Sequence, residues 1–232
     1  MKKILLSTVL LVITMLCFAT TYYISPIGNN ANAGTAASPW KTLVYACQTT
    51  TAGDIIHVTA GTYTETAVAS LKAGVSLEGE GAATTVIKSS IAGDWSVLLV
   101  LESPANTNGN QSISGITFDG QYVSETSYKT WWGIHVSGRS NVTIRDCIVK
   151  NFYDRGVNFD GNTVWNPLVD PGNYATGNKF YNNSLLNTAR CTNNYGAGQL
   201  NIGGQNGMEI YGNTMRQDQR PNFKNGWPIK YW

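Results

Sequence analysis

The stretch IRDCIVKN, residues 144–151, decides the fold because three other octets of the chain share its pattern. They are ISGITFDG at 113–120, FYNNSLLN at 180–187 and IYGNTMRQ at 210–217, and the four starts lie 31, 36 and 30 residues apart. The first and sixth places always hold large apolar residues: Ile113 and Phe118, Ile144 and Val149, Phe180 and Leu185, Ile210 and Met215. The third place holds residue types that tolerate a left-handed backbone: Gly115, Asp146, Asn182 and Gly212. Each octet therefore predicts a strand, a sharp corner and a second strand.

A further strand precedes three of the octets. Its sequence is GIHV from Gly133, GVNF from Gly156 and GQLNI from Gly198, and each begins with glycine and then alternates apolar with polar residues. This alternation marks a strand with one buried face. One repeat then contains three short strands, which can bury their apolar residues only against neighbouring repeats. The sequence thus predicts an all-β fold, a right-handed parallel β-helix built from stacked coils.

The chain begins with two lysines and an apolar run from Ile4 to Phe18. This run is short for a membrane span, and the pattern is typical of a secretory signal peptide. We expect residues 1–19 to be a signal peptide and the mature protein to be secreted, periplasmic or at the cell surface, with no membrane span. A lipoprotein anchor at Cys17 and a short membrane anchor are the alternatives.

The mature chain is weakly charged and balanced. Removing Lys2 and Lys3 from the 16 basic residues leaves 14, equal to the 14 acidic residues, and charged residues are only 13% of the chain. This composition gives no reason to expect nucleic acid as a partner; we expect a polysaccharide instead. Cys47, Cys147 and Cys191 form no CxxC pair, so zinc is not expected. We expect the first two to be buried apolar residues, and we leave open a bridge that involves Cys191.

From about Tyr22 to Trp232, the sequence resembles the secreted pectate-lyase-like parallel β-helix proteins. The resemblance rests on the repeats and on the opening YYISPIGNNANAGTAASPWKTLVYACQTTTAGDIIHVTAGTY. It implies that a short amphipathic helix closes the first coil, and we place this helix at about 39–48. Its residues facing the coil are Leu43, Ala46 and Cys47. The fold hosts lyases, hydrolases, epimerases, esterases and adhesins, so the resemblance does not define the reaction.

We divide the mature chain into an N-terminal cap at 20–53 and a parallel β-helix at 54–232. The last residues, GWPIKYW at 226–232, align with GIHV and GQLNI as the first strand of another coil. A solenoid needs a cap on its terminal repeat. We therefore expect the β-helix to be incomplete at its C-terminus and the chain to be a fragment of a longer protein. A complete chain capped by Trp227 and Trp232 is the alternative.

Alternation also predicts which residues of the first strands point outward: His135, Asn158, Asn201 and Lys230. Coils are spaced about 4.8 Å apart, so these residues should form one outward row. Asp160 lies one pleat from Asn158 on the same face, and we expect His57 on this side two coils earlier. In the enzymes that the sequence resembles, this face is the substrate groove.

The loops beside the row are rich in aromatic and cationic residues. We expect three aromatic side chains to stack on sugar rings: Trp131, Trp165 and Tyr195. Guanidinium groups match the geometry of uronate carboxylates, and the candidates are Arg155, Arg190 and Arg220. The alternatives are ordinary solvent-facing positions for the row and packing on the coil below for the aromatic residues. We expect Asn183 and Asn213, which lie in corners, to form an internal asparagine ladder.

The sequence favours a lyase over a hydrolase, because the NTD, DD and GHG motifs of polygalacturonase-type hydrolases are absent from it. β-Elimination removes the proton α to a uronate carboxyl, and it needs a base and a cation that neutralises the carboxylate. We assign the base to Lys230 or His135 and the cation to Arg220.

A bound Ca²⁺ is the alternative cation, with Asn158, Asn201 and Asp160 as possible ligands. We therefore expect a secreted carbohydrate-active protein that acts on acidic polysaccharide by β-elimination. Two alternatives remain: a non-catalytic glycan-binding or surface module, and a glycoside hydrolase whose catalytic acids lie beyond residue 232.

Overall fold

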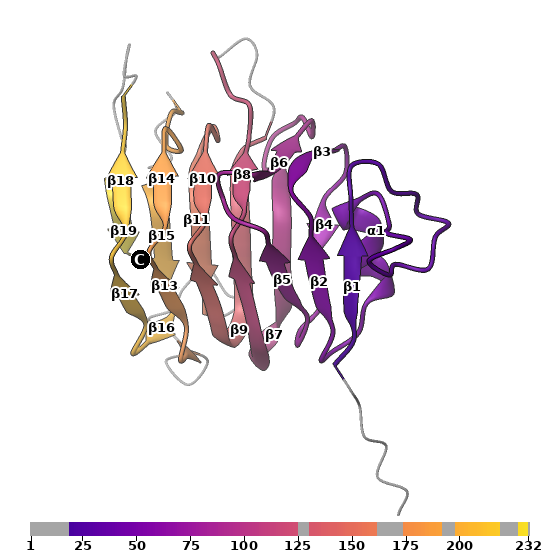
Figure 1. Cartoon of the computed structure of the whole chain (residues 1–232). Helices are drawn as coiled ribbons and strands as arrows, with labels where there is room; N and C mark the ends of the chain where they lie inside the picture. Colours follow the sequence, from indigo (N-terminus) through magenta and orange to yellow (C-terminus); the bar gives the residue numbers. More distant parts are fainter. Residues whose placement is uncertain (1–18, 125–129, 162–173, 192–197, 219–226, 232) are drawn as a thin grey trace, which may run out of the picture.

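The computed structural model describes residues 19–124, 130–161, 174–191, 198–218 and 227–231. Its strands stack side by side along one axis, from β1 and helix α1 at one end to β18 and β19 at the other (Figure 1). Every pairing between the strands of the described part is parallel. The predicted parallel β-helix is therefore confirmed.

The strands form three faces, which we number in the order that the chain visits them within a coil. β7 (Val97–Ser114) and β9 (Trp132–Arg145) each run through a corner, so their first halves pair on face 1 and their second halves on face 2. Face 1 also contains β4 (Ala69–Ser70), β11 (Arg155–Asp160), β15 (Gly198–Gly203) and β19 (Trp227–Tyr231). Face 2 also contains β1 (Thr21–Ile24), β2 (Ile55–Val58), β5 (Ser76–Gly79), β13 (Lys179–Tyr181) and β17 (Glu209–Tyr211).

Face 3 is a separate sheet in the order β18-β14-β10-β8-β6-β3. In chain order its strands are β3 (Gly61–Glu65), β6 (Thr85–Ser89), β8 (Thr117–Asp119), β10 (Ile148–Lys150), β14 (Ser184–Leu186) and β18 (Thr214–Arg216). Two short strands, β12 (Ala175–Thr176) and β16 (Gln205–Asn206), pair just before face 2. The three faces are the three strands per repeat that the sequence predicts.

The first and sixth residues of the octets fill the core, as predicted. Four of them in the middle coils are completely buried: Ile144, Val149, Phe180 and Leu185. Ile210 and Met215, in the last octet, are partly buried and pack against the same core. The third places have the predicted left-handed backbone, with φ of 69° at Gly115, 53° at Asp146, 55° at Asn182 and 64° at Gly212.

Asn183 and Asn213 form the predicted ladder inside the corner between faces 2 and 3. Asn183 Oδ1 accepts the Cys147 N–H at 3.0 Å, and its Nδ2 donates to the Ile144 carbonyl at 3.0 Å and to Asn213 Oδ1 at 3.1 Å. Asn213 Nδ2 donates in turn to the Phe180 carbonyl at 2.9 Å. Each side chain therefore bonds to backbone groups of the preceding coil at the point where the chain turns from face 2 to face 3.

The corner between faces 1 and 2 is held by polar residues that the sequence analysis did not single out. Arg139 is buried and donates to the Leu71 carbonyl at 2.8 Å and to Gln111 Oε1 at 3.0 Å. Asn178 accepts the Val142 N–H at 2.8 Å and donates to the Arg139 carbonyl at 2.9 Å. These bonds tie consecutive coils together where β7 and β9 bend.

Helix α1 (Leu43–Thr49) lies at the N-terminal end of the stack (Figure 1). Its buried residues are the three that were predicted: Leu43, Ala46 and Cys47. The helix begins four residues later than the predicted start at 39, because Trp40 is still extended and exchanges backbone hydrogen bonds with Tyr23 and Ser25. Thr42 caps the helix by accepting the Tyr45 N–H. Glu65 of β3 accepts the Leu43 N–H at 2.7 Å, so a buried carboxylate also binds this N-terminus.

The three cysteines of the described part are buried and form no disulfide with one another: Cys47, Cys147 and Cys191. The first two are the buried apolar residues that were predicted. Among the described residues, helices are too short or too polar to span a bilayer. The predicted signal peptide at 1–19 falls almost entirely outside them and stays a prediction.

Asn183 joins three successive coils in the ladder, through Cys147 and Asn213, and should matter for stability. Replacing it with alanine removes the acceptor of the buried Cys147 N–H and a second donor to the Ile144 carbonyl, and a buried donor left without a partner costs about 1–3 kcal/mol. We expect Asn183→Ala to lower the free energy of unfolding by at least that amount, measured by chemical denaturation. Asn213→Ala is the matched control in a less buried coil. An equal or larger loss for Asn213→Ala would contradict the assignment.

Glu65 should make stability depend on pH. Burial raises the pKa of Glu65 above its ordinary value of 4.5. The folded protein therefore binds this proton more tightly than the unfolded chain, and that stability is present below the unfolded pKa and lost as the pH rises through the folded one. Glu65→Gln keeps an acceptor for the Leu43 N–H and cannot ionise. We expect its free energy of unfolding, relative to wild type, to increase as the pH rises above the ordinary carboxyl pKa of 4.5.

Glu80→Gln is the control with the opposite sign. Hydrogen bonds from the Ala60 N–H and the His57 ring lower the pKa of Glu80. Its stabilising contribution is therefore present above its ordinary pKa and lost as the pH falls. The stability of Glu80→Gln relative to wild type should decrease with rising pH. Parallel profiles for the two variants in chemical denaturation would refute the role given to Glu65.

Candidate functional site

The strand register on face 1 confirms the predicted row. His135 of β9 pairs with Asn158 of β11, Asn158 pairs with Asn201 of β15, and Asn201 pairs with Lys230 of β19. Asp160 follows Asn158 by two residues and so lies on the same side of β11. Parallel pairing without a slip thus lines up residues that are 23 to 95 positions apart in the chain.

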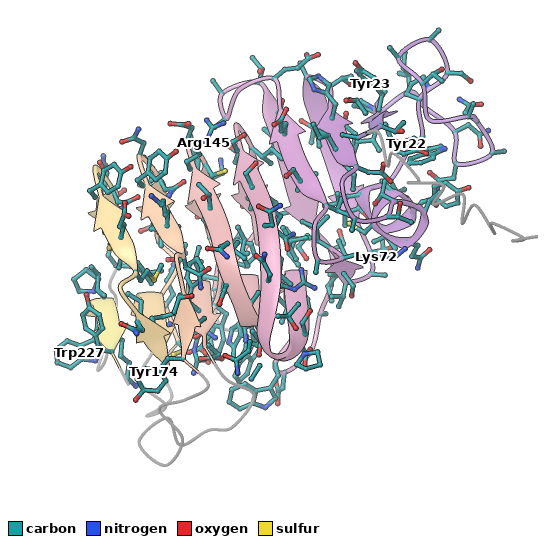
Figure 2. The ribbon with its side chains drawn as sticks, turned by 90° about the horizontal axis from the view of Figure 1, so that it is seen from below. Tyr22, Tyr23, Lys72, Arg145, Tyr174 and Trp227 are labelled. Carbon is teal, nitrogen blue, oxygen red and sulfur yellow. The ribbon has the colours of Figure 1, made fainter. Side chains whose placement is uncertain are left out.

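His57 lies on a different face, contrary to the prediction. It pairs with Tyr23 and Glu78 on face 2, in a row that leads through the second halves of β7 and β9 to Arg145. Figure 2 shows Tyr23 and Arg145 along one edge of the molecule and Trp227 of face 1 along the opposite edge. The reason is that β2 belongs to face 2, although it is the first strand after the helix.

The row points outward as predicted, but two of its positions are not accessible to a ligand. Asn158 and Asn201 point away from the core but are 0% exposed, so they offer a ligand no accessible surface. Their neighbours on the same face are accessible: the side chains of His135 and Asp160 are 18% and 32% exposed. The accessible part of the row is therefore the His135–Asp160 pair at one end and Lys230, which is partly buried, at the other.

His135 and Asp160 come from neighbouring coils and are joined by a hydrogen bond. His135 Nε2 lies 3.0 Å from Asp160 Oδ2. The same carboxylate oxygen accepts from Asn158 Nδ2 at 2.6 Å, and Asn158 Oδ1 accepts from Arg155 Nη1 at 3.3 Å. A histidine with a carboxylate partner and an accessible ring is a group that can take up and release a proton.

Arg155 is buried beneath this pair rather than free to bind a uronate carboxylate. Its guanidinium lies 4.4 Å above the ring of Trp132, and its Nε is 3.3 Å from Asp154 Oδ2. Asp154 also accepts from Trp132 Nε1 at 2.9 Å and from Cys191 Sγ at 3.2 Å. Trp132 in turn meets the ring of His135 edge-on, with centroids 5.1 Å apart. The floor of the site is thus a rigid cluster of paired charges and rings.

The predicted sugar-stacking role of Trp131 does not fit its position. Trp131 is only 6% exposed and belongs to a small apolar cluster beside the main core. Arg190 is likewise engaged within the protein, since it lies 4.4 Å above the Tyr122 ring and donates to the Tyr122 carbonyl. Aromatic packing on the coil below, the alternative that the sequence left open, holds for Trp131.

Trp95 is the accessible aromatic residue that the sequence analysis missed. Its side chain is 48% exposed and lies on the buried pair Trp131 and Trp132, with centroid distances of 4.9 and 5.9 Å. Its backbone is left-handed, with φ of 61°, which costs a non-glycine residue about 1–3 kcal/mol. The sequence did contain an indication of this residue, because the loop with Trp95 leads into β7 just as the loop with Trp131 leads into β9.

Lys230 lies at the other end of the row from His135. Three strand spacings separate them, which corresponds to about 14 Å, so the two side chains cannot act on one sugar. Partial burial lowers the pKa of Lys230 below its ordinary 10.5, and the positive charge of Arg155 adds to this effect. The sequence predicts either Lys230 or His135 as the base, whereas the structure places the two residues at opposite ends of the row.

The residues predicted to bind Ca²⁺ do not fit a cation. The side-chain oxygen of Asn158 faces the guanidinium of Arg155. Asp160 Oδ2 already accepts from Asn158 Nδ2 and lies 3.0 Å from His135 Nε2. Asn201 is buried, and its Nδ2 donates to the Gly198 carbonyl at 3.1 Å. Within the described ranges, histidines, cysteines and carboxylates nowhere gather in the threes that a metal site requires.

Three predicted site residues lie outside the described residues: Trp165, Tyr195 and Arg220. Their roles as stacking residues and as the neutralising cation stay predictions.

Solved structures share this fold, while no curated protein matches the chain in sequence. The ORF18 protein of Geobacillus virus E2 is 15% identical with a TM-score of 0.53, over 71% of this chain and 32% of its own. An alginate lyase from Paenibacillus sp. strain FPU-7 is 15% identical with a TM-score of 0.52, over 85% and 58%. A rhamnogalacturonan lyase is 13% identical with a TM-score of 0.50, over 92% and 63%. The chain therefore spans between a third and two thirds of the length of these proteins.

At these identities the likeness concerns the fold. A match in sequence is found with a family model described as "Protein of unknown function (DUF1565)", which covers residues 26–222, most of the chain. The chain belongs to the DUF1565 family.

Proposed function

We propose that this protein is a secreted carbohydrate-active β-helix protein that acts on an acidic polysaccharide by β-elimination. The fold supports the substrate class, since two proteins of similar structure are named as lyases of rhamnogalacturonan and alginate. The apolar run at 4–18 supports export. The observation that carries the reaction is the accessible His135–Asp160 pair on face 1.

His135 is the base in this proposal. It takes the proton at C5 of a uronate, α to the carboxyl group, and the electron pair of that bond forms the C4=C5 double bond. The C4–O bond breaks as this happens, and its electron pair leaves with the glycosidic oxygen, which takes up a proton. Asp160 stabilises the imidazolium that forms and holds the ring in place. The cation that neutralises the carboxylate of this sugar is assigned, as in the sequence analysis, to Arg220.

Two further side chains can bind the rest of the polysaccharide. A pyranose can stack on the exposed indole of Trp95, which reaches His135 through Trp132. Lys230, about three coil spacings along the row, can pair with the carboxylate of another uronate. A chain lying along face 1 would thus contact Trp95, His135 and Lys230 in turn.

The register also weighs against hydrolysis by a carboxylate pair at this place. Such hydrolysis needs two acids that flank one glycosidic bond. The residues beside Asp160 on the neighbouring strands are Ser137 and Gly203, neither of which is an acid. Asp154, the other acid close by, is 1% exposed and holds Arg155.

The test is a screen of the protein on pectate, alginate and chondroitin, with and without a chelator. We expect an unsaturated uronate product, followed by its ultraviolet absorbance, and a loss of rate of about 10²–10⁴-fold in His135→Gln. His57→Gln is the matched control, because His57 is the other of the two histidines and lies on face 2. Equal rates for the two variants would exclude His135 as the base, and binding without turnover would favour a glycan-binding module.

Lys230→Ala should weaken binding of the acidic polysaccharide at least tenfold, which corresponds to about 1.4 kcal/mol. The reason is the loss of a cation at the far end of the row. The control is Lys150→Ala, since Lys150 lies on face 3 and pairs with Asp119 at 3.6 Å. Isothermal titration of both variants with oligouronates measures the difference. If the two variants bind alike, the polysaccharide does not run along face 1.

A further inference from the structure

Four polar side chains of face 1 form a continuous line of hydrogen bonds that ends on His135. Arg155 Nη1 donates to Asn158 Oδ1 at 3.3 Å, and Asn158 Nδ2 donates to Asp160 Oδ2 at 2.6 Å. That oxygen lies 3.0 Å from His135 Nε2. Arg155 and Asn158 are 3% and 0% exposed, so water does not compete for their bonds.

Arg155, the first residue of this line, can only donate its hydrogen bond to Asn158. A guanidinium only donates hydrogen bonds, so the Asn158 oxygen must face Arg155 and the Asn158 NH₂ group must face Asp160. Arg155 itself is held by Asp154 at 3.3 Å and by the ring of Trp132. The orientation of the Asn158 amide, which is ambiguous in an isolated asparagine, is therefore determined by its surroundings.

The orientation of the Asn158 amide also bears on which ring nitrogen of His135 carries the proton. The atom of residue 160 that meets Asn158 Nδ2 has to be an acceptor, and this same atom meets His135 Nε2. In the neutral imidazole one nitrogen donates and the other accepts. With an acceptor opposite Nε2, the proton belongs on Nε2 and the free electron pair on Nδ1.

We infer that Asn158, oriented by Arg155, is a positioning residue that holds an acceptor oxygen of residue 160 against His135 Nε2, so that the proton of neutral His135 stays on Nε2 and Nδ1 receives the substrate proton. The tautomer follows from the hydrogen bonds alone. The use of Nδ1 in proton transfer rests on the proposed function. Asn158, predicted as a ligand contact, thus acts through two other side chains from a buried position.

The variant Asp160→Asn distinguishes a role of Asn158 from that of the carboxylate charge. An asparagine at 160 could turn either its oxygen or its NH₂ group toward His135. If Asn158 selects an acceptor, the oxygen takes the place of Asp160 Oδ2, and the His135 proton stays on Nε2. When Asn158 is also replaced by leucine, the NH₂ group is free to face Nε2, and the proton moves to Nδ1. The matched control replaces Asn201, the neighbour of Asn158 in the row, which bonds to Gly198 instead.

The experiment measures the ring ¹⁵N chemical shifts of histidine-labelled full-length protein, at a pH well above the ordinary histidine pKa of about 6.5. His57→Gln is the background, so that His135 gives the only histidine signals. We expect a single Nε2–H tautomer in this background, in Asp160→Asn and in Asp160→Asn with Asn201→Leu. We expect a substantial Nδ1–H population in Asp160→Asn with Asn158→Leu.

An Nδ1–H population in Asp160→Asn alone would overturn the inference, and this holds even if the Asn158→Leu variants do not fold. The same populations in the two double variants would also overturn it. Steady-state kinetics is a second, independent measurement. Asn158→Leu should lower kcat about 10–100-fold, the usual scale for residues that orient a functional side chain, and should leave KM unchanged. If no polysaccharide is turned over by wild type, the proposed function fails while the tautomer result stands.

Discussion

The buried apolar side chains of the described strands form one main core that runs through the stacked coils, so this part of the structure depends on the register between coils. A slip by one residue would turn the apolar residues of a strand to the other face of its sheet. Two features oppose such a slip. The left-handed corners at positions such as Asp146 and Asn182 occur at one point of each octet, and the ladder of Asn183 and Asn213 binds backbone groups of the preceding coil.

The same register governs the outside of the coil, where packing does not dictate the residue type. Outward positions of successive coils form straight rows, and a row can carry a different group at each coil. On face 1 this places four different polar side chains in one row: His135, Asn158, Asn201 and Lys230. The accessible pair stands on buried charges that are themselves paired, which avoids the large cost of an isolated charge in the interior.

The core and the corners could be predicted from the octets because burial and a left-handed backbone each admit few residue types. The side of the strand to which each side chain points could be predicted for the same reason, and the order of His135, Asn158, Asn201 and Lys230 in their row was predicted correctly. Exposure could not, because alternation says which way a side chain points and not what covers it. Asn158 is covered by contacts with Arg155 and Asp160, and Trp131 by residues such as Tyr153, about 20 positions away.

Two other differences between the prediction and the structure, the start of the helix and the face of His57, have local causes. Proline at 39 is a favourable first residue of a helix, but the hydrogen bonds between Trp40 and β1 keep the chain extended for three more residues. His57 was misplaced because the first coil begins on face 2, and a single strand does not reveal which of three faces it occupies. Trp95 could have been found by treating its loop like the later loops that enter face 1.

The ladder also has a consequence for how this protein can change over evolutionary time. Asn183 is bonded to Asn213, 30 positions later, and to Cys147, 36 positions earlier, so its fitness is tied to residues one coil away rather than to its neighbours in the chain. Mutations should therefore be accepted in pairs separated by about one repeat. A change of length inside a strand disrupts the contacts to both adjacent coils, whereas the gain or loss of one entire coil preserves them. Whole repeats are thus the natural units by which such a gene can grow or shrink.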